Sequence, residues 1–237
     1  MLEDALRYPL DSDDRLATLV IGGLLLVFSF LILPAFVLQG YLLRVLRSSA
    51  NGDAAAPSFT DWGDLLVDGL KLLVVSVIYG VGITIPFVVG AAVIGLGGLT
   101  GSDAGLAAFG ILGVLVLLVA SLVAIVVGYV LPAAITNFAL EGSIGAAFDL
   151  AAIREAAFSS RYLVGVLLGV VLGGVINTVA SPLAFLLVGI PLLFYGQVVT
   201  YYCFGRGFAE ATGVHGGGDG GVDREDDGDA RMTTETL

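Results

Sequence analysis

Four long stretches without Asp, Glu, Lys or Arg constrain the fold of this chain more than any other feature. They cover residues 16–43, 72–102, 104–140 and 162–205. A helix that crosses the hydrocarbon core of a bilayer needs about 20 apolar residues, and each stretch exceeds that length. A soluble domain carries about 25% charged residues, whereas this chain has 13% and is 57% hydrophobic. The pattern predicts an all-α fold, a polytopic transmembrane helical bundle within residues 16–209, and excludes a soluble enzyme.

Length and proline placement predict four firm spans in the last three stretches. We expect apolar helices at about 71–96 and 105–139. The last stretch is too long for one span and too short for three, so we divide it into helices at about 162–179 and 183–208. The break is expected where polar residues precede Pro182.

The first stretch allows two interpretations. Residues 16–47 form either one helix kinked at Pro34, which would be a fifth span, or a re-entrant hairpin that turns there. Cytoplasmic loops carry an excess of Lys and Arg. The hairpin places all ten bases inside the cell, whereas the single span leaves Arg7 and Arg15 outside. The count favours the hairpin slightly. Both interpretations place the C-terminal tail in the cytoplasm.

Two connectors predict interfacial segments on the cytoplasmic side, at about 60–70 and 143–160. In the first, Thr60 is the expected N-cap of a helix. Acidic residues near a helix N-terminus favour the positive end of its dipole. A helical arrangement puts the charged residues on one face and Trp62 on another, as expected of a helix at the membrane surface. The charged residues are Asp61, Asp64, Asp68 and Lys71.

The charged residues are concentrated at the two ends and in the connectors, and the net charge is −11. Residues 1–15 form an acidic N-terminal segment, and 210–237 form a Gly/Asp-rich tail that we expect to be disordered. Such acid excess with a single lysine favours a salt-loving organism and argues against nucleic acid as a partner. The one cysteine excludes an internal disulfide.

Four short motifs follow one another at an unusual spacing. They are Ile21-Gly22-Gly23-Leu24-Leu25, Gly40-Tyr41-Leu42-Leu43-Arg44, Phe59-Thr60-Asp61-Trp62-Gly63 and Asp68-Gly69-Leu70-Lys71. In this order they resemble a largely haloarchaeal membrane-protein family known only as domain of unknown function 4013. The resemblance runs from about residue 5 to 209. It implies a polytopic helical protein of a prokaryotic cell membrane, and it brings no activity or catalytic residue.

A search for reactive groups finds no catalytic constellation, so the sequence predicts no enzyme, no cofactor and no metal site. Asp61, Asp64 and Asp68 could gather a divalent cation, but helix capping already explains two of them. The uncharged stretches retain a few amides, which either join helices or line a polar pathway. These amides are Gln39, Asn137, Asn177 and Gln197.

Small and polar residues recur every four positions in the helix expected at 162–179. They form a stripe of Gly165, Gly169, Gly173, Asn177 and Ser181. Residues four apart lie on nearly one helical face, and small residues let a second backbone approach closely. The stripe predicts tight packing within the monomer first, and otherwise a homo-oligomer contact or a groove for lipid.

These features favour a non-enzymatic integral membrane protein that scaffolds a complex or organises lipid. Its expected partners are the lipid bilayer and a second copy or another membrane protein. The alternative is a transporter or permease-like unit for a small or lipidic solute, in which the amides would line the route. A membrane enzyme that uses the Asp61 face as a metal site has the least support.

Overall fold

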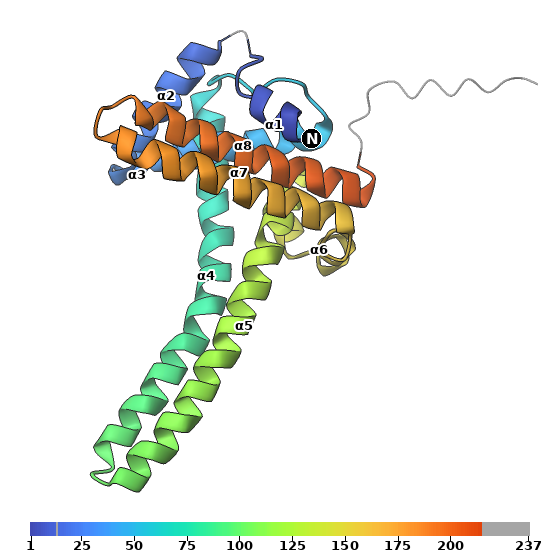
Figure 1. The fold of residues 1–237 in the computed structure, drawn as a ribbon. Coiled ribbons are helices and arrows are strands. Elements are labelled where there is room, and N and C mark those ends of the chain that lie inside the picture. Colours follow the sequence, from blue (N-terminus) through green and yellow to red (C-terminus); the bar gives the residue numbers. More distant parts are fainter. Residues whose placement is uncertain (13, 215–237) are drawn as a thin grey trace, which may run out of the picture.

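The computed structural model describes residues 1–12 and 14–214, and every regular element in them is a helix. The long helices are α2 (Arg15–Val27), α3 (Ile32–Asn51), α4 (Trp62–Leu99), α5 (Asp103–Glu141), α7 (Ser160–Ala184) and α8 (Gly189–Thr212). The short ones are α1 (Leu2–Arg7), η1 (Phe28–Phe30), η2 (Ile144–Phe148) and α6 (Leu150–Ala157). Figure 1 shows α4 and α5 leaving the remaining helices as a long pair, with α7 and α8 running across its base.

Two regions follow from this shape. We call residues 80–128, which comprise parts of α4 and α5 and the turn between them, the arm, and the other described residues the body. In Figure 1 the arm is the green pair that extends away from everything else.

Side-chain caps and left-handed residues fix several helix ends. The Ser102 hydroxyl accepts a hydrogen bond from the Gly105 amide at 3.1 Å at the start of α5. At the start of α6, the Asp149 carboxylate accepts from the Ala151 and Ala152 amides. α3 and α5 both end at glycines with positive φ, Gly52 at 90° and Gly142 at 71°, a conformation that glycine adopts without steric cost.

The core of the body lies between α8 and the helices around it. Tyr41 of α3, Phe194 of α8 and Tyr8 beyond α1 are fully buried in one cluster. The rings of Tyr8 and Tyr202 lie 4.4 Å apart, and those of Tyr41 and Phe194 lie 5.5 Å apart. Residues 1–15, expected only as an acidic segment, thus contribute an aromatic side chain to the core.

The arm packs only within itself. Its two helices approach closely where Gly90 faces α5, since a Cβ there would lie 2.7 Å from Leu117 Cδ2. Large apolar side chains point outward along its length and are exposed. They include Val81, Ile85, Val88, Leu96, Ile111, Leu115, Leu118, Leu122 and Ile125.

Three of the described helices are long and apolar enough to cross a membrane: α4, α5 and α7. The predicted all-helical fold is confirmed, but the count of four firm spans is not. The fourth expected span coincides with α8, which carries Gln197, Thr200 and Arg206 and is the central helix of the body. Its apolar side chains are largely buried against α2, α3 and α7 rather than exposed.

The first apolar stretch is a helical hairpin. α2 ends at Val27, the chain turns through η1, and α3 begins at Ile32. The turn precedes the expected one, because Leu31 has extended backbone and Pro34 lies in the first turn of α3. A proline in the first turn of a helix forfeits no intrahelical hydrogen bond, since those amides have no partner there.

Several predicted boundaries differ from the observed ones. The break expected before Pro182 falls instead at residues 185–188, where Leu187 has a φ of 62°, so Pro182 stays within the last turn of α7. Residues 60–70 do not form a separate helix, because α4 runs without interruption from Trp62 into the apolar stretch. α8 extends to Thr212, and residues 215–237 of the predicted tail lie outside the described residues.

Candidate functional site

Two glycines allow α3 and α4 to cross at backbone contact. A Cβ added to Gly40 would overlap the carbonyl of Leu65, and a Cβ added to Gly69 would overlap the carbonyl of Phe36. Each helix therefore presents a glycine to the backbone of the other. These glycines belong to the Gly40-Tyr41-Leu42-Leu43-Arg44 and Asp68-Gly69-Leu70-Lys71 motifs, which the crossing explains.

The segment before α4 is held against α3 by the Gly40-Tyr41-Leu42-Leu43-Arg44 motif. The Tyr41 hydroxyl donates a hydrogen bond to the Pro57 carbonyl at 3.0 Å, and its ring stacks on Phe59 at 4.0 Å. The Arg44 guanidinium donates to the carbonyl and the hydroxyl of Thr60 at 2.9 and 3.1 Å. The expectation that Thr60 caps the helix is therefore wrong, because its hydroxyl accepts from Arg44. Asp61 is the N-cap residue and makes no side-chain cap.

One turn further along α3, Arg47 joins three helices. Its Nε donates to the Ala139 carbonyl of α5 at 2.5 Å, and its Nη2 lies 3.9 Å from the Asp68 carboxylate of α4. Lys71 lies 3.7 Å from the same carboxylate. We call Arg44, Arg47, Thr60, Asp68 and Lys71 the polar junction. It joins α4 and α5 to α3 below the arm.

The polar junction does not form a metal centre from the aspartates of α4. Within residues 1–12 and 14–214, no group of three or more His, Cys, Asp or Glu lies close enough to hold a metal ion. Asp68 faces two cations, whereas Trp62 and Asp64 lie on the exposed surface. Asp61, Asp64 and Asp68 therefore do not converge as ligands.

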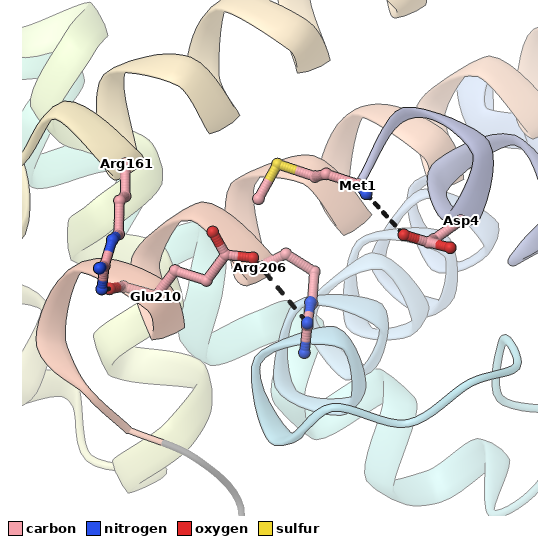
Figure 2. A network of polar contacts seen from close by, with 5 residues as sticks. All are labelled: Met1, Asp4, Arg161, Arg206 and Glu210. Atoms are coloured by element: carbon pink, nitrogen blue, oxygen red, sulfur yellow. Dashed lines mark hydrogen bonds and ion pairs between the residues drawn. The ribbon is translucent and has the colours of Figure 1, made fainter.

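A second group of polar contacts lies where α1, α7 and α8 meet (Figure 2). Arg206 pairs with Glu210 at 3.9 Å, and Arg161 of α7 donates to the Glu210 carbonyl at 3.2 Å. The amine of Met1 hydrogen-bonds the Asp4 carboxylate at 2.6 Å, and this bond lowers the pKa of Asp4. Of these contacts, the Arg161 bond to the Glu210 carbonyl joins α7 to α8, whereas the other two are local to α8 and to the N-terminus.

A tyrosine inserts into the helical ladder of α5 where the arm meets the body. The Tyr162 hydroxyl of α7 donates to the Tyr129 carbonyl at 2.8 Å and accepts from the Ala133 amide at 2.9 Å. These two groups are four residues apart and would otherwise bond each other within the helix. Pro132 lies beside them, and a proline inside a helix removes one ladder hydrogen bond and bends the chain. The hydroxyl thus satisfies buried backbone groups at a distorted turn.

The glycine end of the predicted stripe faces α8. A Cβ at Gly165 would lie 2.7 Å from the Gly207 Cα, and one at Gly169 would lie 3.1 Å from the Thr200 carbonyl oxygen. A Cβ at Gly173 would overlap the Thr200 hydroxyl, which itself donates to the Gly169 carbonyl at 3.3 Å. The remaining two members, Asn177 and Ser181, lie on the exposed surface, where the Ser181 hydroxyl donates to Asn177.

The four amides proposed for a polar pathway lie in different surroundings. Asn137 is buried and its side-chain nitrogen donates to the Ala146 carbonyl of η2 at 3.0 Å. Asn177 and Gln39 are exposed, on α7 and α3, and Gln197 of α8 is half-buried. Asn137 therefore joins α5 to η2 rather than facing a shared route.

Sequence reasoning missed Tyr162 and Arg47 as contacts between helices. Both side chains act on backbone carbonyls, of Tyr129 and of Ala139, that are remote in the sequence. Pro132 was a usable signal, because a proline within a long apolar helix distorts the neighbouring turn, whose backbone groups then need other partners.

The described residues define an all-helical protein with three apolar helices compatible with a membrane protein and a polar junction at the base of two of them. A family model described as "Protein of unknown function (DUF4013)" matches residues 24–196, and the chain belongs to this family. The match confirms the predicted resemblance to domain of unknown function 4013 and includes three of the four motifs entirely. No curated protein and no solved structure matches the chain.

Proposed function

We propose that the protein is a non-enzymatic integral membrane protein that organises lipid, or scaffolds a partner, around its helical arm. The observation that carries this proposal is the outward face of the arm, which is apolar and exposed along its whole length. An exposed apolar surface of this extent needs lipid or protein to cover it. Residues 80–99 of the arm extend about 30 Å at 1.5 Å per residue, which matches the roughly 30 Å of a hydrocarbon core.

The positions of the Lys and Arg residues support one orientation of the protein in the cell membrane. Arg44, Arg47 and Lys71 lie at the base of the arm, and Arg161 and Arg206 lie at the ends of α7 and α8. The turn between α4 and α5 contains no base. Because cytoplasmic segments carry the excess of Lys and Arg, the base of the arm and the C-terminal tail lie in the cytoplasm. A hairpin α2–α3 that returns to its own side is consistent with this orientation.

The same proposal includes the partners of the protein and the salt environment in which it works. The bilayer covers the arm, and a second copy or another membrane protein is the scaffolded partner. The acid excess of the whole sequence, −11 in net charge, supports a haloarchaeal protein that works at high salt, where charge repulsion is screened.

The alternative of a transporter has less support. A pathway would need its amides free and gathered, whereas Asn137 is bonded to η2 and Asn177 lies on the exposed surface. Interhelical hydrogen bonding is the ordinary role of such amides in membrane helices.

Cysteine labelling tests the orientation. In a Cys203→Ala background, Thr100→Cys should react with a membrane-impermeant maleimide in intact cells. Ala55→Cys, before α4, should react only after lysis. Labelling of Ala55→Cys in intact cells, or protection of Thr100→Cys there, would contradict the orientation.

Reconstitution tests the function. In vesicles of phosphatidylcholine, the anisotropy of a lipid-chain probe should rise with the ratio of protein to lipid, compared with protein-free vesicles. The same vesicles should remain tight to small solutes. Unchanged anisotropy would contradict the proposal that the protein organises lipid. Protein-dependent uptake of a solute would instead support the alternative of a transporter.

A further inference from the structure

A cavity of about 740 Å³ lies between α5 and α6, next to the base of the arm. From α5 it is lined by Val126, Tyr129 and Val130, which are spaced as neighbours on one helical face. The other lining residues come from α6 and from Phe158, which follows it, and most of them share one face of that helix. They are Leu150, Ala151, Ile153, Arg154, Ala157 and Phe158. Two helical faces thus form the walls of a groove.

The walls are apolar apart from one guanidinium. Leu150 and Phe158 are 77% and 87% exposed, so the edges of the groove are apolar and uncovered. Arg154 is the one charged residue in the lining. Among the hydrogen bonds and ion pairs of residues 1–12 and 14–214, its side chain takes part in none, whereas Arg44, Arg47, Arg161 and Arg206 each have a partner.

The two walls are held in place by contacts that leave the groove open. The Tyr129 hydroxyl donates to the Ala157 carbonyl at 2.8 Å and joins α5 to the end of α6. Ala156, which does not line the groove, and Ile153, which does, are both buried and pack α6 against the body. Asp149 uses its carboxylate to cap α6, so that group does not neutralise Arg154.

We propose that this groove binds one anionic phospholipid, with its phosphate at Arg154 and an acyl chain between α5 and α6. The proposal rests on the membrane location proposed above. The acyl chain continues from the groove along the exposed face of α5, past Leu122 and Val119, one and two turns from Val126. A guanidinium pairs with phosphate oxygens through two parallel hydrogen bonds. Bases at the cytoplasmic surface also attract anionic lipids.

Native mass spectrometry of the full chain released from nanodiscs tests the proposal. With phosphatidylglycerol and phosphatidylcholine in equal amounts, the wild-type protein should retain phosphatidylglycerol preferentially. Arg154→Gln should reduce that preference about fivefold, the effect expected of one base near a membrane surface. Arg7→Gln is the matched control, because Arg7 is an exposed base of α1 paired with Glu3, and it should leave the preference unchanged.

A second variant tests the acyl site. Ala151→Trp fills the groove and should lower the retention of both lipids, whereas Ala107→Trp, on the exposed arm, should not. Equal melting temperatures of the variants show that they are folded.

Equal retention of both lipids by the wild-type protein, or an unchanged preference in Arg154→Gln, would contradict the proposal that this groove binds an anionic phospholipid. If the maleimide labelling gives the expected pattern, that result does not contradict the proposed membrane location. If the labelling fails as well, both proposals fall.

Discussion

The arm and the body are made of similar residues and packed by different means. Both contain many glycines and aliphatic side chains, but the arm buries few of them, and its apolar faces are exposed on both helices. The body buries aromatic rings such as Tyr41, Phe194 and Phe138, and its helices meet at backbone contact. Glycine spacing alone therefore does not tell a packed face from an exposed one.

Polar contacts mark the boundary between the two regions. Tyr79 donates to the Ala147 carbonyl at 2.7 Å, and Tyr129 donates to the Ala157 carbonyl at 2.8 Å. Beyond these tyrosines, α4 and α5 contact only each other. The body has a buried core of its own, although α2, η1 and α7 also expose large apolar side chains, whereas the arm buries few of its residues.

The largest expected effect is at the crossing of α3 and α4. Gly40→Ala places a methyl group on the Leu65 carbonyl, and a backbone atom cannot rotate away. We expect a loss of about 3 kcal/mol or more in the free energy of unfolding, measured by denaturation in detergent. Gly80→Ala in the arm has open space around its Cβ and should gain up to about 1 kcal/mol from helix propensity. Equal effects at the two sites would erase the distinction between body and arm.

The two faces of α7 allow a comparison within one helix. Gly169→Leu pushes into Phe204 and the Thr200 backbone and should cost about 2–3 kcal/mol. Gly174→Leu points into open space on the same helix and should change stability by less than about 0.5 kcal/mol. The melting temperatures of the two solubilised variants give the answer. A Gly169→Leu protein that melts with the wild type would show that the stripe is not packed.

Removal of one hydroxyl tests the joint between arm and body. Tyr162→Phe leaves the Ala133 amide and the Tyr129 carbonyl without their shared partner, which should cost about 1–3 kcal/mol. Hydrogen exchange at residues 129–133 should accelerate. The control is Tyr202→Phe, whose hydroxyl makes no hydrogen bond within the described residues. Comparable exchange in both variants would rule out a role for Tyr162 as a bridge.

The smallest effect is one of pH. Burial raises the pKa of Tyr8 above its ordinary value, so the folded body favours the neutral phenol. Stability is then constant below the unfolded pKa of about 10 and decreases as pH rises above it. The arm has no tyrosine, so alkaline unfolding followed by near-UV spectroscopy should loosen the body first. Tyr8→Phe should reduce the loss, and an identical pH profile in that variant would contradict this assignment.

Much of the fold could be predicted from the sequence, and rather less of the site. α4 and α5 follow from two long uncharged stretches, because every charged side chain is excluded from them over the length of a span. The end of α7 and the start of α8 could not be placed from the sequence, because Pro182 is tolerated in a last helical turn. The turn between the two helices falls instead on residues 185–188. Thr60 was assigned to a cap because its competing partner, Arg44, lies on another helix.

The sequence by itself determined that this chain is helical, strongly apolar in blocks and charged between them, and its motifs determined the family. These properties depend on residues that are near one another in the chain. Only the tertiary structure decided which glycines bring backbones together, that α8 is buried at the centre of the body, and that Tyr162 completes the ladder of α5. Each of these depends on contacts between segments far apart in the sequence, and the same apolar residues satisfy a local helix whether lipid or protein covers them.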